Sequence, residues 1–62
     1  MTVYSLIQSN LQDGKVILIP LKNPSKKKEY STQNIRKYPK EFQQQVKGWD
    51  IDYNYLIFYV YI

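Results

Sequence analysis

The stretch that decides the fold is the C-terminal run Asp52-Tyr53-Asn54-Tyr55-Leu56-Ile57-Phe58-Tyr59-Val60-Tyr61-Ile62. One parity of this run holds four tyrosines and Ile57, and the other holds Leu56, Phe58, Val60 and Ile62. Because successive side chains of a strand point to opposite faces, the run predicts a strand with one tyrosine-rich face and one aliphatic and phenyl face. A strand this apolar invites aggregation at a bare sheet edge, so we expect it in the middle of a sheet or paired with a second copy.

The first half of the chain predicts two more strands. Residues 2–8 alternate loosely between β-branched or aromatic and polar residues, and residues 15–21 form a nearly continuous apolar run. Between them, Asp13-Gly14 is a strong hairpin signal, because glycine adopts the positive φ that tight turns need. Pro20 has no amide hydrogen to donate, so the second strand ends or bulges there, or turns that position away from a partner.

The middle of the chain predicts a loop and then a helix. Residues 22–32 are polar and basic, with a possible short strand at residues 29–32 that pairs back. Pro39 suits the first position of a helix over residues 39–47, and Gly48 suits the position just after it. We expect this helix region to contribute a core stripe of Ile35, Phe42, Val46 and Trp49, packed against Leu56, Phe58, Val60 and Ile62.

The predicted fold class is α+β: a small antiparallel sheet of three to four strands in β-β-α-β order, with one helix packed on one face. At 62 residues the chain forms a single small basic domain (residues 1–62) near the lower size limit for independent folding. Self-association would add buried area, so we expect a homo-oligomer built at least partly on residues 53–62.

The composition limits the chemistry. The chain has no cysteine and no histidine, so disulfides, thiolate zinc sites and the commonest general base are missing. Its acidic residues are scattered, and we expect no metal and no cofactor. Asp50 and Asp52 are close together, but such carboxylates are more often solvated or capping groups, and Ser25-Lys26 lies in a loop with nothing visible to desolvate the lysine. The sequence therefore predicts a protein that is not an enzyme.

Location and source are also suggested by the sequence. It has no apolar segment long enough to span a membrane and no signal-peptide pattern, so we expect an intracellular (cytoplasmic) protein that makes no membrane contact. Tyrosine, isoleucine, asparagine and lysine are abundant, and alanine is absent. This bias favours AT-rich codons and is typical of genes from low-GC bacteria and their phages or plasmids.

The charge distribution points to a partner. The chain carries a net charge of +4, and nearly all the positive charge gathers in residues 22–40, where the only acidic residue is Glu29. Clustered cations neutralise phosphates, and interleaved aromatic rings can stack on bases. A lysine-rich loop can equally be a solvated loop that keeps a small protein in solution. The candidate nucleic-acid-binding residues are Lys22, Lys26, Lys27, Lys28, Tyr30, Arg36, Lys37, Tyr38 and Lys40.

The tyrosine face of the last strand has three interpretations. Tyrosines can be ordinary half-buried strand residues, contacts at a protein interface, or a stacking platform for single-stranded nucleic acid. The candidate protein-interface residues are Tyr53, Tyr55, Tyr59 and Tyr61.

Two functions follow from these patterns. The first is non-enzymatic binding of nucleic acid, DNA or RNA, largely indifferent to base sequence because lysine outnumbers arginine. The second is a protein-binding module encoded by a phage or other mobile element, which docks on a host protein through the tyrosine strand or the basic loop. Salt separates the two, since phosphate binding weakens steeply with ionic strength and a tyrosine-centred interface does not.

Overall fold

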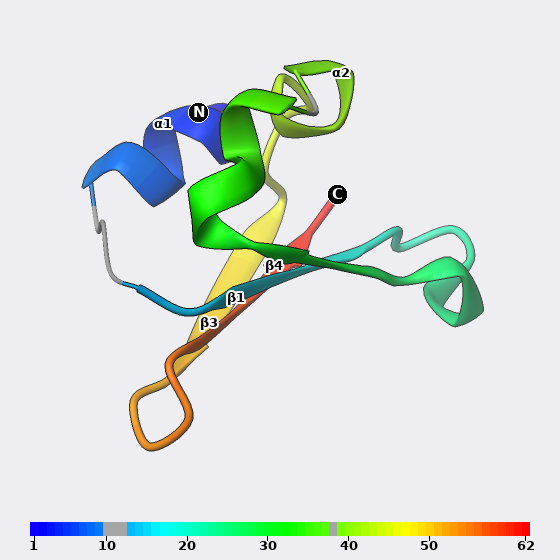
Figure 1. Cartoon of the computed structure of the whole chain (residues 1–62). Helices are drawn as coiled ribbons and strands as arrows, with labels where there is room; N and C mark the ends of the chain where they lie inside the picture. Colours follow the sequence, from blue (N-terminus) through cyan, green and yellow to red (C-terminus); the bar gives the residue numbers. More distant parts are fainter. Residues whose placement is uncertain (10–12, 38) are drawn as a thin grey trace.

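The computed structural model describes residues 1–9, 13–37 and 39–62, without the side chains of Ile35 and Arg36. Its helices and strands follow the order helix, strand, strand, helix, strand, strand, with two 3₁₀ segments (Figure 1). The elements are α1 (Val3–Ser9), β1 (Lys15–Ile19), η1 (Pro24–Lys26), β2 (Lys28–Ser31), η2 (Thr32–Lys37), α2 (Pro39–Phe42), β3 (Gly48–Asp52) and β4 (Ile57–Tyr61).

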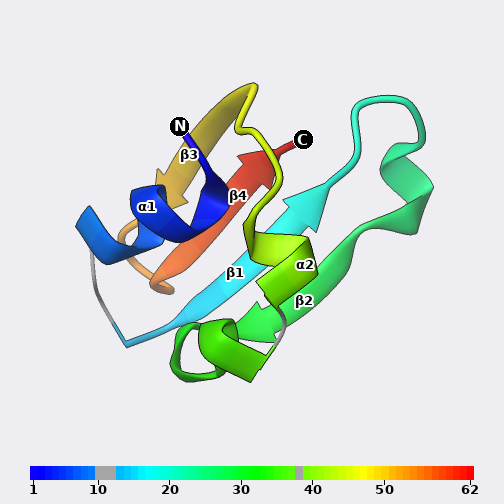
Figure 2. The same ribbon diagram turned by 90° about the horizontal axis from the view of Figure 1, so that it is seen from above.

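The strands of the described ranges form one mixed sheet in the order β2-β1-β4-β3 (Figure 2). The two central strands run parallel, with Val16 opposite Phe58 and Leu18 opposite Val60, and each outer strand pairs antiparallel with its neighbour. The α+β class and the central position of the C-terminal strand are confirmed. The predicted β-β-α-β order is roughly matched, since α1 precedes it and a further strand follows α2. The purely antiparallel sheet is wrong, because two hairpins are joined through a parallel central pair. Both central strands are almost wholly apolar, as strands in the parallel part of a sheet usually are.

The core lies between the sheet and the helices, which cover one face of the sheet (Figures 1 and 2). Its buried side chains come from α1, α2 and the even-numbered positions of the central strands: Val3, Leu6, Ile7, Val16, Leu18, Phe42, Phe58 and Val60. The predicted inward parity of the last strand is therefore confirmed at Phe58 and Val60, and Ile62 packs against the core while partly buried. Leu56 is 42% exposed and does not belong to this layer.

The strand predicted over residues 2–8 is wrong, because this segment forms α1. Val3, Leu6 and Ile7 recur at helical spacing and are all buried. A capping box closes the first turn: the Ser5 amide donates to Thr2 Oγ1 and the Thr2 amide donates to Ser5 Oγ, each at 3.2 Å. The local cap and the apolar stripe together outweigh the β preference of the individual residues.

The helix predicted over residues 39–47 is shorter, since α2 ends at Phe42. The chain beyond it forms hydrogen bonds to other segments: the Val3 amide donates to the Gln44 carbonyl, the Val46 amide to the Met1 carbonyl, and the Lys47 amide to the Tyr61 carbonyl. Gly48 consequently begins β3 instead of following a helix.

The predicted core stripe is confirmed in part. Phe42 is fully buried, and Val46 is half-buried against the core. Trp49 is wrongly placed by the prediction, because it lies on the edge strand β3 and is 49% exposed. The side chain of Ile35 lies outside the described residues.

The hairpin predicted at Asp13-Gly14 is wrong, since the described element before β1 is the helix α1 and β1 pairs with β2 and β4. Gly14 exchanges two hydrogen bonds with Thr32, from the Gly14 amide to Thr32 Oγ1 (3.1 Å) and from the Thr32 amide to the Gly14 carbonyl (3.0 Å). A Cβ at position 14 would collide with the carbonyl oxygen of Leu56, which accepts a hydrogen bond from the Lys15 amide. Glycine is required here because two backbones approach closely.

The last strand is also shorter than predicted, because residues 53–56 form the turn between β3 and β4. Asp52 caps this turn: its Oδ1 accepts the amide of Asn54 at 3.0 Å and that of Tyr55 at 3.3 Å. Leu56 completes the turn with a positive φ of 53°. Tyr53 and Tyr55 therefore lie on the turn and do not continue the tyrosine face of the strand.

The buried position of Phe42 predicts a large loss of stability on truncation. Phe42→Ala should lower the free energy of unfolding by about 3–5 kcal/mol, because it leaves a cavity between α2 and the sheet. Trp49→Ala is the matched control and should cost much less, since Trp49 is about half exposed. Denaturant unfolding measures both changes. Equal losses for the two variants would contradict the assignment of the core.

The close approach at Gly14 predicts a second difference in stability. Gly14→Ala should cost about 1–3 kcal/mol, because the added methyl group forces the β3–β4 turn away from the start of β1. Gly48→Ala is the control, since the nearest atom to its added Cβ is a Tyr61 ring carbon at an ordinary 3.7 Å. Thermal unfolding of both variants checks the prediction, and a Gly14→Ala protein as stable as Gly48→Ala would refute it.

Candidate functional site

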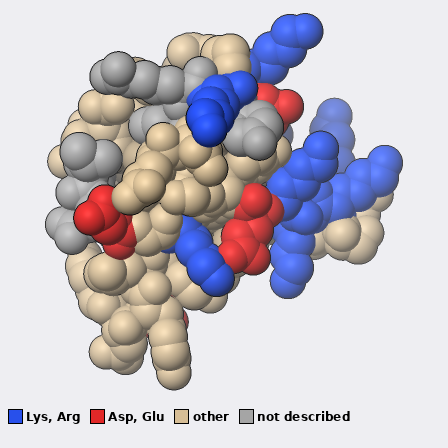
Figure 3. Space-filling view, in the orientation of Figure 1, with Lys and Arg blue, Asp and Glu red and all other residues tan. Residues whose placement is uncertain are grey.

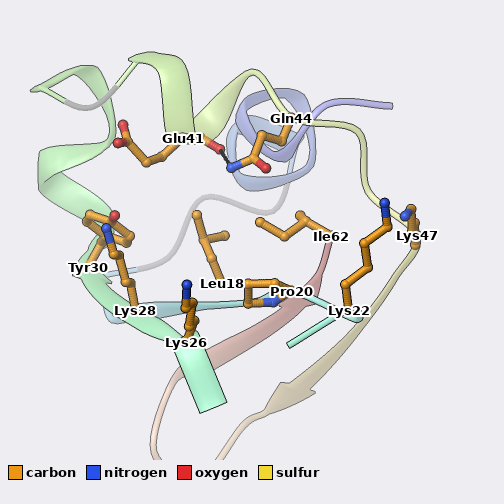
Figure 4. Close-up of a pocket in the computed structure, with 10 residues that line it drawn as sticks. All are labelled: Leu18, Pro20, Lys22, Lys26, Lys28, Tyr30, Glu41, Gln44, Lys47 and Ile62. Atoms are coloured by element: carbon orange, nitrogen blue, oxygen red, sulfur yellow. Dashed lines mark hydrogen bonds between the residues drawn. The ribbon is translucent and has the colours of Figure 1, made fainter. Parts of the chain in front are cut away.

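A cavity of about 540 Å³ opens where the parallel central strands end (Figure 4). It lies between the sheet and the segment that begins at α2. Its lining residues come from five parts of the chain: Leu18, Pro20, Lys22, Lys26, Lys28, Tyr30, Glu41, Gln44, Lys47 and Ile62.

The sheet side of the cavity is apolar. Leu18 is buried, and Pro20, Tyr30 and Ile62 are half-buried. Pro20 ends β1 because it has no amide hydrogen, while the Ile62 amide donates to the Ile19 carbonyl and keeps the two strand ends together. These residues form a hydrophobic floor that is open on one side.

The Tyr30 ring is held in place by the core. It packs edge to face on Phe42, with the ring centroids 5.3 Å apart and the planes at 68°. Because Phe42 is fully buried, the contact fixes the orientation of the tyrosine that lines the cavity.

Four lysines surround this floor. Lys22 and Lys26 come from the connection between β1 and β2, Lys28 is the first residue of β2, and Lys47 comes from the segment just before β3 (Figure 4). In the described ranges none of them forms an ion pair with a carboxylate, and Glu41 is the one acidic residue that lines the cavity. A concave surface with mostly one sign of charge concentrates the electrostatic potential and attracts anions.

Local hydrogen bonds shape the connection that carries Lys22 and Lys26 and leads to Lys28. The Asn23 amide donates to the Pro20 carbonyl at 3.2 Å, and the Lys26 amide donates to the Asn23 carbonyl at 3.0 Å. Ser25 Oγ donates to Asn23 Oδ1 at 2.6 Å and closes the turn that leads into η1. Lys and Arg side chains gather at the end of the molecule where this connection lies (Figures 1 and 3).

The structure brings together four of the predicted nucleic-acid-binding residues, namely Lys22, Lys26, Lys28 and Tyr30. Lys27 is exposed on the same connection but does not line the cavity. Lys37 and Lys40 are exposed on η2 and α2 and do not line it either. The side chain of Arg36 and the whole of Tyr38 lie outside the described residues.

Lys47 is the site residue that sequence reasoning missed. It reaches the cavity because its amide donates to the Tyr61 carbonyl at 2.8 Å, which sets it beside the end of β4. No local pattern around Lys47 signals this position. Only the pairing of β3 with β4 reveals it.

The sheet face opposite the helices is a second surface of interest. We call it the open face; its apolar part consists of Ile17, Ile19, Ile57, Tyr59 and Tyr61, all half-buried. Tyr59 and Tyr61 confirm the predicted alternation. Tyr53 and Tyr55 are 78% and 76% exposed on the turn, so the four tyrosines do not form one continuous surface.

A second hollow, of about 680 Å³, lies near the β3–β4 turn and is lined by Asp13, Gly14, Lys15, Glu29, Tyr30, Ser31, Tyr55 and Leu56. Its lysine is already paired, since Lys15 Nζ lies 2.9 Å from Glu29 Oε1. With its cation neutralised and a further carboxylate present, this hollow offers no excess positive charge to an anion.

Comparison of the chain with protein-family models, with curated proteins and with solved structures finds no match. Across residues 1–9, 13–37 and 39–62, no helix is long and apolar enough to cross a membrane. Among the same residues, no three side chains of the metal-binding types gather in one place.

Proposed function

We propose that this protein binds nucleic acid through the lysine-edged cavity at the end of β1 and β4, without catalysing a reaction. The observation that carries the proposal is the convergence of Lys22, Lys26, Lys28 and Lys47 around one hollow, with no carboxylate paired to them in the described part of the chain. Converging cations bind phosphate groups and release the counterions around them.

The type of cation supports binding that is indifferent to base sequence. Lysine is a flexible point charge and lacks the rigid bidentate fork with which arginine reads guanine. All four lysine side chains are exposed, so each can change its conformation to reach a phosphate group when the path of the bound strand varies. If each one neutralises one phosphate of a single strand, the logarithm of the affinity should fall with the logarithm of salt concentration with a slope of about −3.

Two triple variants, which have the same net charge as each other, test the site. Lys26→Glu/Lys28→Glu/Lys47→Glu reverses charge at the cavity, and Lys27→Glu/Lys37→Glu/Lys40→Glu reverses as much charge on exposed lysines that do not line it. The first should abolish binding of labelled DNA and RNA oligonucleotides in fluorescence anisotropy, and the second should weaken it only modestly. Both melting temperatures should stay near that of the parent protein, because no changed side chain belongs to the core. Equal losses of affinity would contradict the cavity as the binding site.

A second candidate function, association between proteins, is favoured by the open face. Its half-buried isoleucines and tyrosines alternate along the two central strands with the core residues, so they lie on the other face of the sheet. The helices cover the core face alone (Figure 1). We take a second copy of this chain as the partner, because face-to-face packing of two such sheets would add a second hydrophobic layer to a domain with a small core. A host protein on this face is the alternative.

Self-association through the open face predicts that Tyr59→Asp dissociates the assembly, because Tyr59 is near the centre of the apolar surface. Tyr53→Asp is the matched control and should leave the assembly intact, since Tyr53 lies exposed on the turn. Sedimentation velocity at high micromolar concentration distinguishes the two. A parent protein that sediments as a 7.5 kDa particle would rule out the second copy as the partner.

A further inference from the structure

The cavity combines an apolar surface with a group of positive charges. Its floor consists of Leu18, Pro20, Tyr30 and Ile62, and its edge carries four ammonium groups. A phosphate group alone would use the edge and leave the floor in contact with water. A ligand that joins a flat, largely apolar ring to flanking anions would use both.

We propose that the cavity receives an unpaired base of a nucleic-acid strand, with the neighbouring phosphates held by the surrounding lysines. This inference rests on the proposed function and specifies its ligand as single-stranded. Every base has an apolar face, so a base placed on this floor removes apolar surface from water whatever its identity. The binding mode is therefore compatible with indifference to sequence.

The size and shape of the cavity support this assignment. Its volume of about 540 Å³ falls within the range of sites that take small molecules, so a single base has room to enter. In a duplex the base is stacked and paired, and it reaches a cavity only after extrusion from the helix, which costs free energy. A single strand offers the base without that cost.

The placement of the lysines favours a strand over a free mononucleotide. Lys22 and Lys47 lie at one side of the cavity, and Lys28 lies at the other side beside Tyr30 (Figure 4). Within a strand, each nucleotide has phosphates on both its 5′ and 3′ sides. The two groups of lysines can therefore hold the phosphates that flank one base.

The opposite wall of the cavity supplies polar groups. Gln44 and Glu41 lie across from the sheet, and Gln44 Nε2 donates to the Glu41 carbonyl at 3.2 Å (Figure 4). This bond uses one amide hydrogen and leaves Gln44 Oε1 able to accept a hydrogen bond. The second amide hydrogen of Gln44 also stays available, so this side chain can meet both the donors and the acceptors on the edge of a base. The Glu41 carboxylate would repel a phosphate, which favours the base over the phosphate against this wall.

Three probes of equal length separate the contribution of the base from that of the phosphates. They are a single strand of about 12 nucleotides, the duplex of the same sequence, and a strand of abasic sites with the same phosphates. We expect the single strand to bind at least about tenfold more tightly than either other probe at equal salt, because a base contact is typically worth that factor or more. If the abasic strand binds as well as the normal strand, the base inference is wrong while the proposed function stands. If no probe binds even at low salt, both are wrong.

A cavity-filling variant tests the same point from the side of the protein. Gln44 is exposed and lines the cavity, so Gln44→Trp should block the base without disturbing the core. Gln43→Trp is the control, since Gln43 is exposed next to it and does not line the cavity. We expect Gln44→Trp to reduce affinity for the normal strand to the level of the abasic strand, with affinity for the abasic strand unchanged. An equal effect of the two variants, or an equal loss on both strands, would overturn the inference.

Discussion

The parallel pairing of β1 with β4 is the contact on which the rest of the structure depends. It sets Val16 beside Phe58 and Leu18 beside Val60, and these four side chains form the sheet half of the core. This pairing joins the β1–β2 hairpin and the β3–β4 hairpin into one four-stranded sheet within the described residues. Because both strands run in the same direction, their carboxyl ends meet at one edge, and the candidate site is built at that edge.

The position of the site follows from how each strand ends. Pro20 follows the end of β1, the connection to β2 contributes two cavity lysines, and the first residue of β2 contributes a third. The hydrogen bond from the Lys47 amide to the Tyr61 carbonyl brings a fourth lysine to the same place from the other hairpin. Mutual repulsion of these cations destabilises the free protein to some extent, and binding of an anionic strand relieves it. Exposure of the lysines keeps that cost low, since water screens them.

The single helix layer leaves the two faces of the sheet in different environments. On the covered face, Phe42 is fully buried and orients Tyr30 toward the cavity, so the core and the candidate site share a contact. On the open face, Ile17, Tyr59 and their neighbours are half-buried. Tyrosine suits such a position, because its ring covers apolar neighbours while its hydroxyl remains in water.

The sequence by itself determined the elements whose signal is local. The apolar alternation of the last strand, the strand that stops at Pro20, the burial of Phe42 and the basic segment that supplies Lys22, Lys26 and Lys28 could all be read from it. Tertiary structure decided the features that depend on distant backbone partners. Residues 44–47 do not continue the helix, because they form hydrogen bonds with the N-terminal segment and β4. Gly14 lies against the carbonyl of Leu56. Lys47 lines a cavity whose other lysines lie at least nineteen positions earlier in the chain. Such pairings are set by long-range hydrogen bonding and packing, which no window of neighbouring residues contains.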